Sequence, residues 1–182
     1  MKSLISGGSL KMEIEIKRRT YLNKKAIKEL KAKIPPDWRN ILDVKRTVEY
    51  IEFKNSVRFI LVEKIPTFII LKDKDSKEEV VIPHLKLLVD TDKIVLPKVV
   101  VDRGAVSFVM NGANIMRPGV TYFDNNIKNG TIVGVYPENF DKPIAVGKSL
   151  ITSEAFDKIT KGAIVKNLHY LNDIFWKLVK KL

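Results

Sequence analysis

The residues best suited to chemistry lie in the stretch 101–119, VDRGAVSFVMNGANIMRPG. Arg103 and Arg117 bring positive charge to a segment whose glycines and alanines leave little side-chain bulk. Such a surface favours contact with a polyanion, because a phosphate backbone can approach the main chain and the guanidinium groups closely. Packing and helix capping are the alternative task of these glycines, and the residues alone leave both interpretations open.

No pattern typical of an enzyme accompanies this stretch. The chain has no cysteine and only two histidines, which excludes a thiolate nucleophile, a cysteine-held zinc and a histidine-rich metal site. Residues 146–149 (VGKS) lack the first glycine of a P-loop. Asp102 and His169 are the remaining candidates for an acid and a base, and a helix cap and a structural histidine explain them more simply. We expect no catalysis, no cofactor and no metal.

The composition favours a polyanionic partner. The 182 residues carry a net charge of +12, with a sequence pI near 9.7, and so large a basic excess is typical of nucleic-acid-binding proteins. A solvated basic surface is the alternative. The sequence has no apolar run long enough for a membrane span and begins with a poor signal peptide, so we expect a cytoplasmic protein.

The stretch 101–119 predicts a short helix followed by a strand and a turn. Asp102 can accept a backbone N–H at the helix start. Ala105, Phe108, Val109 and Gly112 recur at helical spacing, so we expect this face to pack. Gly112 lies where a helix commonly ends in a left-handed residue.

The chain before this stretch predicts a small antiparallel sheet covered by a helix. Residues 12–18 alternate between apolar and polar, as in a half-buried strand. Residues 22–34 have helical periodicity, with Asn23 as cap and lysines on the outer face, which are either a phosphate contact or a solvated surface. A short helix capped by Asp37 follows, and Trp38 is expected in the core. Further strands are predicted at 48–53, 57–62, 67–71 and 79–82.

The chain after this stretch predicts a small barrel. A helix is expected at 153–161, capped by Ser153 and ended by Gly162. Short strands at even spacing are typical of closed or nearly closed β structures, and they are predicted at 98–102, 120–123, 131–136, 144–150, 163–167 and 174–178. The fold class is therefore α+β.

Several motifs resemble those of the PUA domain, an RNA-binding module. They are VDRGAV…GANIMRPGV, then AVGKS, then KGAIVKNLHYLND. The ending NLHYLND with Trp176, together with IPHLKLL at 82–88, is similar to the malignant T-cell-amplified-sequence family of translation factors in an archaeal-type form. The resemblance implies a pre-PUA α/β domain at 1–94 and a C-terminal PUA β-barrel (pseudobarrel) at 95–182.

The resemblance also implies a function. It suggests a non-catalytic RNA-binding protein that holds the acceptor end of tRNA on the small ribosomal subunit during initiation, reinitiation or recycling. A partner chain similar to density-regulated protein, with an initiation-factor-one-like domain, is implied as well. The alternatives are an accessory subunit that delivers tRNA or rRNA to a modification enzyme, and an adaptor that binds only peptide.

The RNA-binding positions of such domains carry over to this sequence residue by residue. They fall on the first helix of the domain, the strand after it and the segment AVGKS. The implied RNA-binding residues are Asp102, Arg103, Gly104, Ala105, Ala113, Asn114, Met116, Arg117, Pro118, Gly119, Gly147 and Lys148. A turn-stabilising hydrogen bond is the alternative task of Asn114, and packing is that of Met116.

Overall fold

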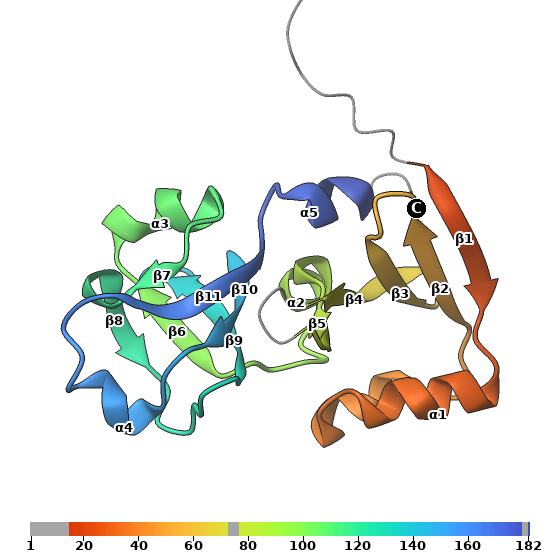
Figure 1. The fold of residues 1–182 in the computed structure, drawn as a ribbon, viewed down its shortest axis with the longest axis horizontal. Coiled ribbons are helices and arrows are strands. Elements are labelled where there is room, and N and C mark those ends of the chain that lie inside the picture. The colour runs from red at the N-terminus through yellow and green to blue at the C-terminus, as the bar shows by residue number, and fades with distance from the viewer. Residues whose placement is uncertain (1–14, 73–76, 180–181) are drawn as a thin grey trace, which may run out of the picture.

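The chain folds around two antiparallel-rich sheets joined by a short connector. A computed structural model describes residues 15–72, 77–179 and 182. The first sheet has the strand order β1-β2-β3-β4-β5, and the second has the order β7-β11-β10-β9-β6-β8. Figure 1 shows the two sheets side by side, with the connector running between them. The α+β class predicted from the sequence is confirmed.

The first sheet is an antiparallel meander whose neighbours in sequence are neighbours in space. Helix α1 (Lys24–Ala32) begins where the Asn23 side chain accepts the Ala26 N–H, and it buries Ile27 and Leu30. The 3₁₀ helix η1 (Pro36–Ile41) follows and places Trp38 in the core. The strands are β1 (Ile16–Tyr21), β2 (Val48–Phe53), β3 (Arg58–Val62), β4 (Ile65–Lys72) and β5 (Glu79–Pro83).

The second sheet curls into a nearly closed barrel. Its two end strands, β7 (Ile115–Met116) and β8 (Val120–Phe123), are joined by the 3₁₀ helix η2 (Arg117–Gly119). Only β6 and β9 run parallel, and the other described pairs are antiparallel. The remaining elements are α2 (Leu85–Asp90), β6 (Lys98–Val101), α3 (Arg103–Met110), β9 (Ile132–Pro137), β10 (Ala145–Ser149), α4 (Ser153–Phe156), β11 (Ala163–Tyr170) and α5 (Ile174–Leu178).

Several local predictions differ from the structure. The predicted strand at 12–18 lies partly outside the described residues, and β1 is largely exposed rather than half-buried. Residue 37 does not cap η1, which has no side-chain cap. Helix α4 is much shorter than 153–161 and follows Thr152. The strand predicted at 174–178 was wrong, because Asp173 accepts the Trp176 N–H and starts helix α5 there.

The two sheets share buried apolar contacts. The core of the first sheet takes in Val146 from β10 and Leu178 from α5. Phe175 and Trp176 pack against the same cluster. In Figure 1, α1 lies below the first sheet and α5 above it, so the end of the chain returns from the second sheet to the first. The predicted boundary at residue 94 falls in the connector between α2 and β6.

Candidate nucleic-acid interface

Helix α3 is positioned by its two ends. At its start the Asp102 carboxylate accepts the Ala105 N–H at 2.8 Å, and the Asp102 N–H donates to the Gly119 carbonyl at 2.9 Å. At its end Gly112 takes a φ of 86°, a left-handed conformation with little steric cost for glycine. Both the predicted cap and the predicted helix end are confirmed. These contacts hold α3 beside the turn η2.

An open groove of about 520 Å³ lies between α3, β7 and η2, and we call it the α3–β7 groove. Two large apolar side chains stand in it with much of their surface exposed, Phe108 at 67% and Met116 at 50%. Two glycines, two alanines and a proline form much of the remaining wall. The lining residues are Asp102, Gly104, Ala105, Phe108, Val109, Ala113, Asn114, Ile115, Met116, Pro118 and Gly119.

Most of the residues predicted to bind RNA line this groove. The exceptions are Arg103, Arg117, Gly147 and Lys148. The Asn114 side chain already makes one hydrogen bond within the protein, because its oxygen accepts the Asn167 N–H of β11 at 3.1 Å. Among the described residues, no lysine or arginine lines this groove, whereas the sequence suggested a cationic surface.

The four predicted RNA-binding residues that do not line the α3–β7 groove lie in other parts of the second sheet and its helices. The Arg117 guanidinium donates to the carbonyls of Phe156 and Val120 and lies 3.8 Å from the centre of the Phe156 ring. It therefore ties η2 to α4. Gly147 is buried where β10 meets β11, and Lys148 is half-buried opposite Lys166 in the same strand pair. Arg103 is exposed at the start of α3 and faces a different groove.

Phe108 is the residue that the sequence placed on the wrong face. Helical spacing grouped it with Val109 as a packing residue, and only Val109 is buried, at 1% exposure. The spacing of apolar residues gives a helix an apolar side but does not say which edge of that side meets the sheet. No local pattern in the sequence marked Phe108 as exposed.

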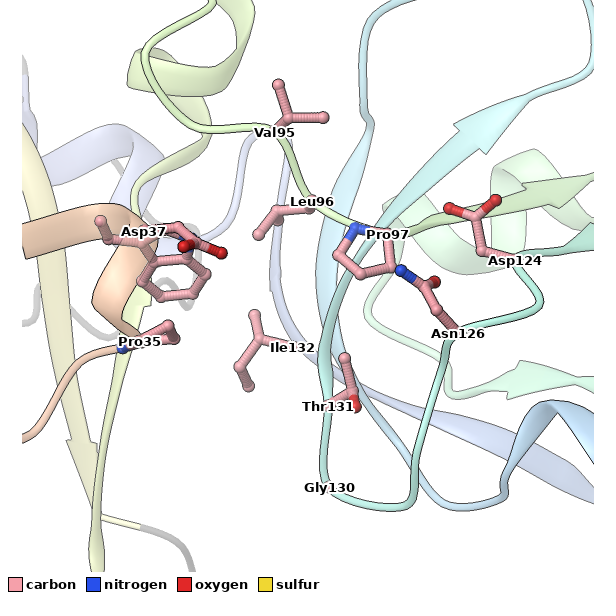
Figure 2. A pocket seen from close by; sticks show the side chains of 11 residues that line it. Pro35, Asp37, Val95, Leu96, Pro97, Asp124, Asn126, Gly130, Thr131 and Ile132 are labelled. Carbon is pink, nitrogen blue, oxygen red and sulfur yellow. The ribbon is translucent and has the colours of Figure 1, made fainter.

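A second hollow, of about 550 Å³, lies at the junction of the two sheets and was not predicted. Figure 2 shows its walls, with Asp37 on one side and Asp124 on the other. The Asp124 carboxylate already accepts the Lys98 N–H at 2.5 Å and the Tyr122 hydroxyl at 2.7 Å. This hollow contains none of the residues predicted to bind RNA.

His169, the candidate base, lies inside the protein. It is fully buried, and its Nδ1 lies 2.7 Å from the Asp173 carboxylate. The ring of His84 lies 4.7 Å away, centre to centre, and is equally buried. Burial, together with the nearby His169, lowers the pKa of His84 to about 3. Both histidines are buried in the core, and for His169 this agrees with the structural role that the sequence suggested.

Two further properties of the described part of the chain concern metals and membranes. Among residues 15–72, 77–179 and 182, no group of three or more histidine, aspartate and glutamate side chains is arranged to hold a metal ion. None of the helices in these ranges is long and apolar enough to span a bilayer.

The comparisons with known proteins all point to the same protein family. A model of the PUA domain matches residues 97–171. The uncharacterized protein MJ1432 of Methanocaldococcus jannaschii is 40% identical over 168 residues, which span 90% of this chain and 98% of that protein. Translation machinery-associated protein 20 of Saccharomyces cerevisiae is 29% identical over 175 residues, 89% and 93% of the two chains.

A match over a shorter part of the chain and a match to a solved structure agree with this family. Human malignant T-cell-amplified sequence 2 is 38% identical over 99 residues, about half of each chain. The crystal structure of hypothetical protein PH0734.1 from Pyrococcus horikoshii is 31% identical with a TM-score of 0.73, and the match covers 89% of this chain and 99% of that one. With its α3–β7 groove inside the matched domain, this chain belongs to the family of PUA-domain proteins that includes MJ1432, translation machinery-associated protein 20 and the malignant T-cell-amplified sequence proteins.

Proposed function

We propose that this chain is a non-catalytic RNA-binding protein of translation that holds a single-stranded RNA end, the acceptor end of tRNA, in the α3–β7 groove. The observation that carries the proposal is the pair of exposed side chains, Phe108 and Met116, in an open groove on the PUA domain. The name of one relative, translation machinery-associated protein 20, supports a role in translation.

The chemistry of the groove suits unpaired bases. RNA ends and single strands expose the faces and edges of bases, which stack on aromatic side chains. Phe108 offers such a face, and the small residues around it leave room for a base. The net charge of +12 supplies the long-range attraction that the groove itself lacks. Arg117 also holds η2 in place through its hydrogen bonds to the carbonyls of Phe156 and Val120.

The cellular setting is part of the same proposal. We propose that the tRNA is held on the small ribosomal subunit, with a separate chain similar to density-regulated protein as partner. Co-purification tests this setting: ribosomal subunits are expected with the tagged chain. An RNA-modification enzyme in their place would favour delivery of RNA to that enzyme.

The decisive test measures RNA affinity with and without the acceptor end. We expect the purified full chain to bind intact tRNA more tightly than tRNA lacking its terminal CCA. Phe108→Ala is expected to weaken binding of intact tRNA by about tenfold, because one stacked base is lost. Tyr21→Ala is the matched control, since Tyr21 is equally exposed at 69% but lies on β1. Equal affinity for both tRNA forms would contradict the proposal.

A further inference from the structure

Helix α3 has a second groove on its other side, between the helix and the segment that follows β9. This α3–β9 groove has a volume of about 640 Å³ and includes Arg103, Val106, Met110, Glu138, Asn139 and Phe140 among its lining residues. Phe140 is 70% exposed, as exposed as Phe108 in the α3–β7 groove. Two open grooves, each with one exposed phenylalanine ring, therefore flank one helix.

We propose that the α3–β9 groove is a second nucleobase site, which takes a neighbouring nucleotide of the same RNA strand. The proposal rests on the proposed function, because it extends the RNA path from the α3–β7 groove across α3. Phe140 supplies an aromatic face for stacking. Val106 and Met110, both half-buried, form an apolar floor beneath it.

The rim of the groove supplies the polar groups that a nucleotide needs. The Arg103 guanidinium is exposed at the start of α3 and suits a phosphate, which it can bind with two parallel N–H groups. The Glu138 carboxylate can only accept hydrogen bonds when ionised, so it favours a base with an exocyclic amine. Cytosine, adenine and guanine have such an amine, and uracil does not. Glu138 therefore selects among bases, while Phe140 binds any of them.

The start of α3 lets one strand reach both grooves. Arg103 lines the α3–β9 groove, and the next residue, Gly104, lines the α3–β7 groove. Because Gly104 has no side chain, a strand can cross the helix there in contact with the main chain. Arg103 then lies beside the crossing and can neutralise the phosphate between the two bases. This charge favours RNA over an apolar protein segment as the occupant.

The experiment uses the full chain and a stem–loop RNA with a single-stranded 3′ end, in which each unpaired nucleotide is replaced in turn by an abasic one. Phe140→Ala is expected to weaken binding of the unmodified RNA about tenfold. One abasic position, different from the position that depends on Phe108, is expected to weaken binding to the wild-type chain equally. That same abasic RNA is expected to bind Phe140→Ala and the wild-type chain alike, since the stacked pair is already lost.

Two further variants separate stacking from general apolar contact. Phe140→Tyr is expected to keep the affinity, and Phe140→Leu is expected to lose it, because leucine has no aromatic face. Full affinity in Phe140→Leu would overturn the proposal and point to an apolar protein segment in the groove. A cytosine-to-uracil change at the sensitive position is expected to weaken binding to the wild-type chain but not to Glu138→Ala. Equal binding of both RNAs by the wild-type chain would overturn the role of Glu138.

Failure of this inference can be told from failure of the proposed function. If Phe108→Ala weakens RNA binding and Phe140→Ala does not, the second site is refuted while the first remains. If the wild-type chain binds no RNA, both are refuted. Phe140 is largely exposed, so each variant at this position should fold, and circular dichroism checks that it has.

Discussion

Two glycines predicted to contact RNA have different surroundings. A Cβ on Gly147 would lie 2.3 Å from Val165 Cγ1 and 2.9 Å from the carbonyl oxygen of Lys166, both in the neighbouring strand. A Cβ on Gly104 would meet only the Asp102 Oδ1, at 3.3 Å. Gly147 thus permits the close approach of β10 and β11, whereas Gly104 leaves the start of α3 open.

These surroundings predict opposite effects of the same substitution. Gly147→Ala is expected to lower the free energy of unfolding by about 1–3 kcal/mol, because a buried strand pair must move apart. Gly104→Ala is expected to leave stability unchanged or slightly higher, since alanine favours a helix, and to weaken RNA binding by obstructing the crossing over α3. Urea unfolding and RNA titration of both variants check this. Equal loss of stability in the two would contradict the assignment.

The sequence predicted side chains well where one local rule decides them. The Asn23 and Asp102 caps and the left-handed Gly112 follow from hydrogen bonding and backbone sterics within a few residues. Contacts with distant partners could not be read from the local sequence. The Arg117 guanidinium donates to the carbonyl of Phe156, which lies 39 residues further along the chain.

At the scale of elements, helix α5 shows why short apolar runs mislead. Residues 174–178 read IFWKL, and five residues are too few to separate helical from strand periodicity. The deciding group is the preceding Asp173. Its carboxylate accepts the N–H of Trp176 at 2.8 Å and that of Tyr170 at 3.0 Å, and it contacts His169. In contrast, the predicted strands at 48–53, 57–62, 67–71 and 79–82 lie within a few residues of β2, β3, β4 and β5.

Removal of that carboxylate is expected to destabilise the junction of the two sheets. Asp173→Ala loses a helix cap and leaves buried donors unpaired, so the free energy of unfolding should fall by about 3 kcal/mol. Asp157→Ala, at an exposed carboxylate after α4, is the control and should change stability little. Urea denaturation measures both. An unchanged midpoint in Asp173→Ala would contradict the role given to this residue.

At the scale of the whole molecule, the buried His84 makes stability depend on pH. His84 Nδ1 accepts the Lys86 N–H at 3.0 Å, and the ring is stacked against Trp176 from α5. Burial and the neighbouring His169 lower the pKa of His84 to about 3 in the folded chain, whereas its ordinary value is 6.5. Between these values the unfolded chain binds the proton and the folded chain does not, so stability falls as the pH falls.

This difference in the pKa of His84 predicts that the free energy of unfolding changes measurably with pH. Between pH 6.5 and 4.5 the free energy of unfolding should decrease by about 2 kcal/mol on account of His84. His84→Asn keeps an acceptor at the start of α2 but cannot titrate, so its stability should change less over the same range. Urea unfolding of both proteins at several pH values gives the comparison. Parallel pH profiles would show that His84 is not the responsible group.

The shared core has a mechanical consequence. Because β10 and α5 both contribute side chains to the core of the first sheet, the two halves cannot swivel about the connector independently. The direction in which α3 faces is therefore fixed relative to the lysines of α1, on the other lobe of the molecule. A macromolecule bound to α1 would therefore fix the orientation of a ligand bound along α3, because the two helices keep a constant relative position.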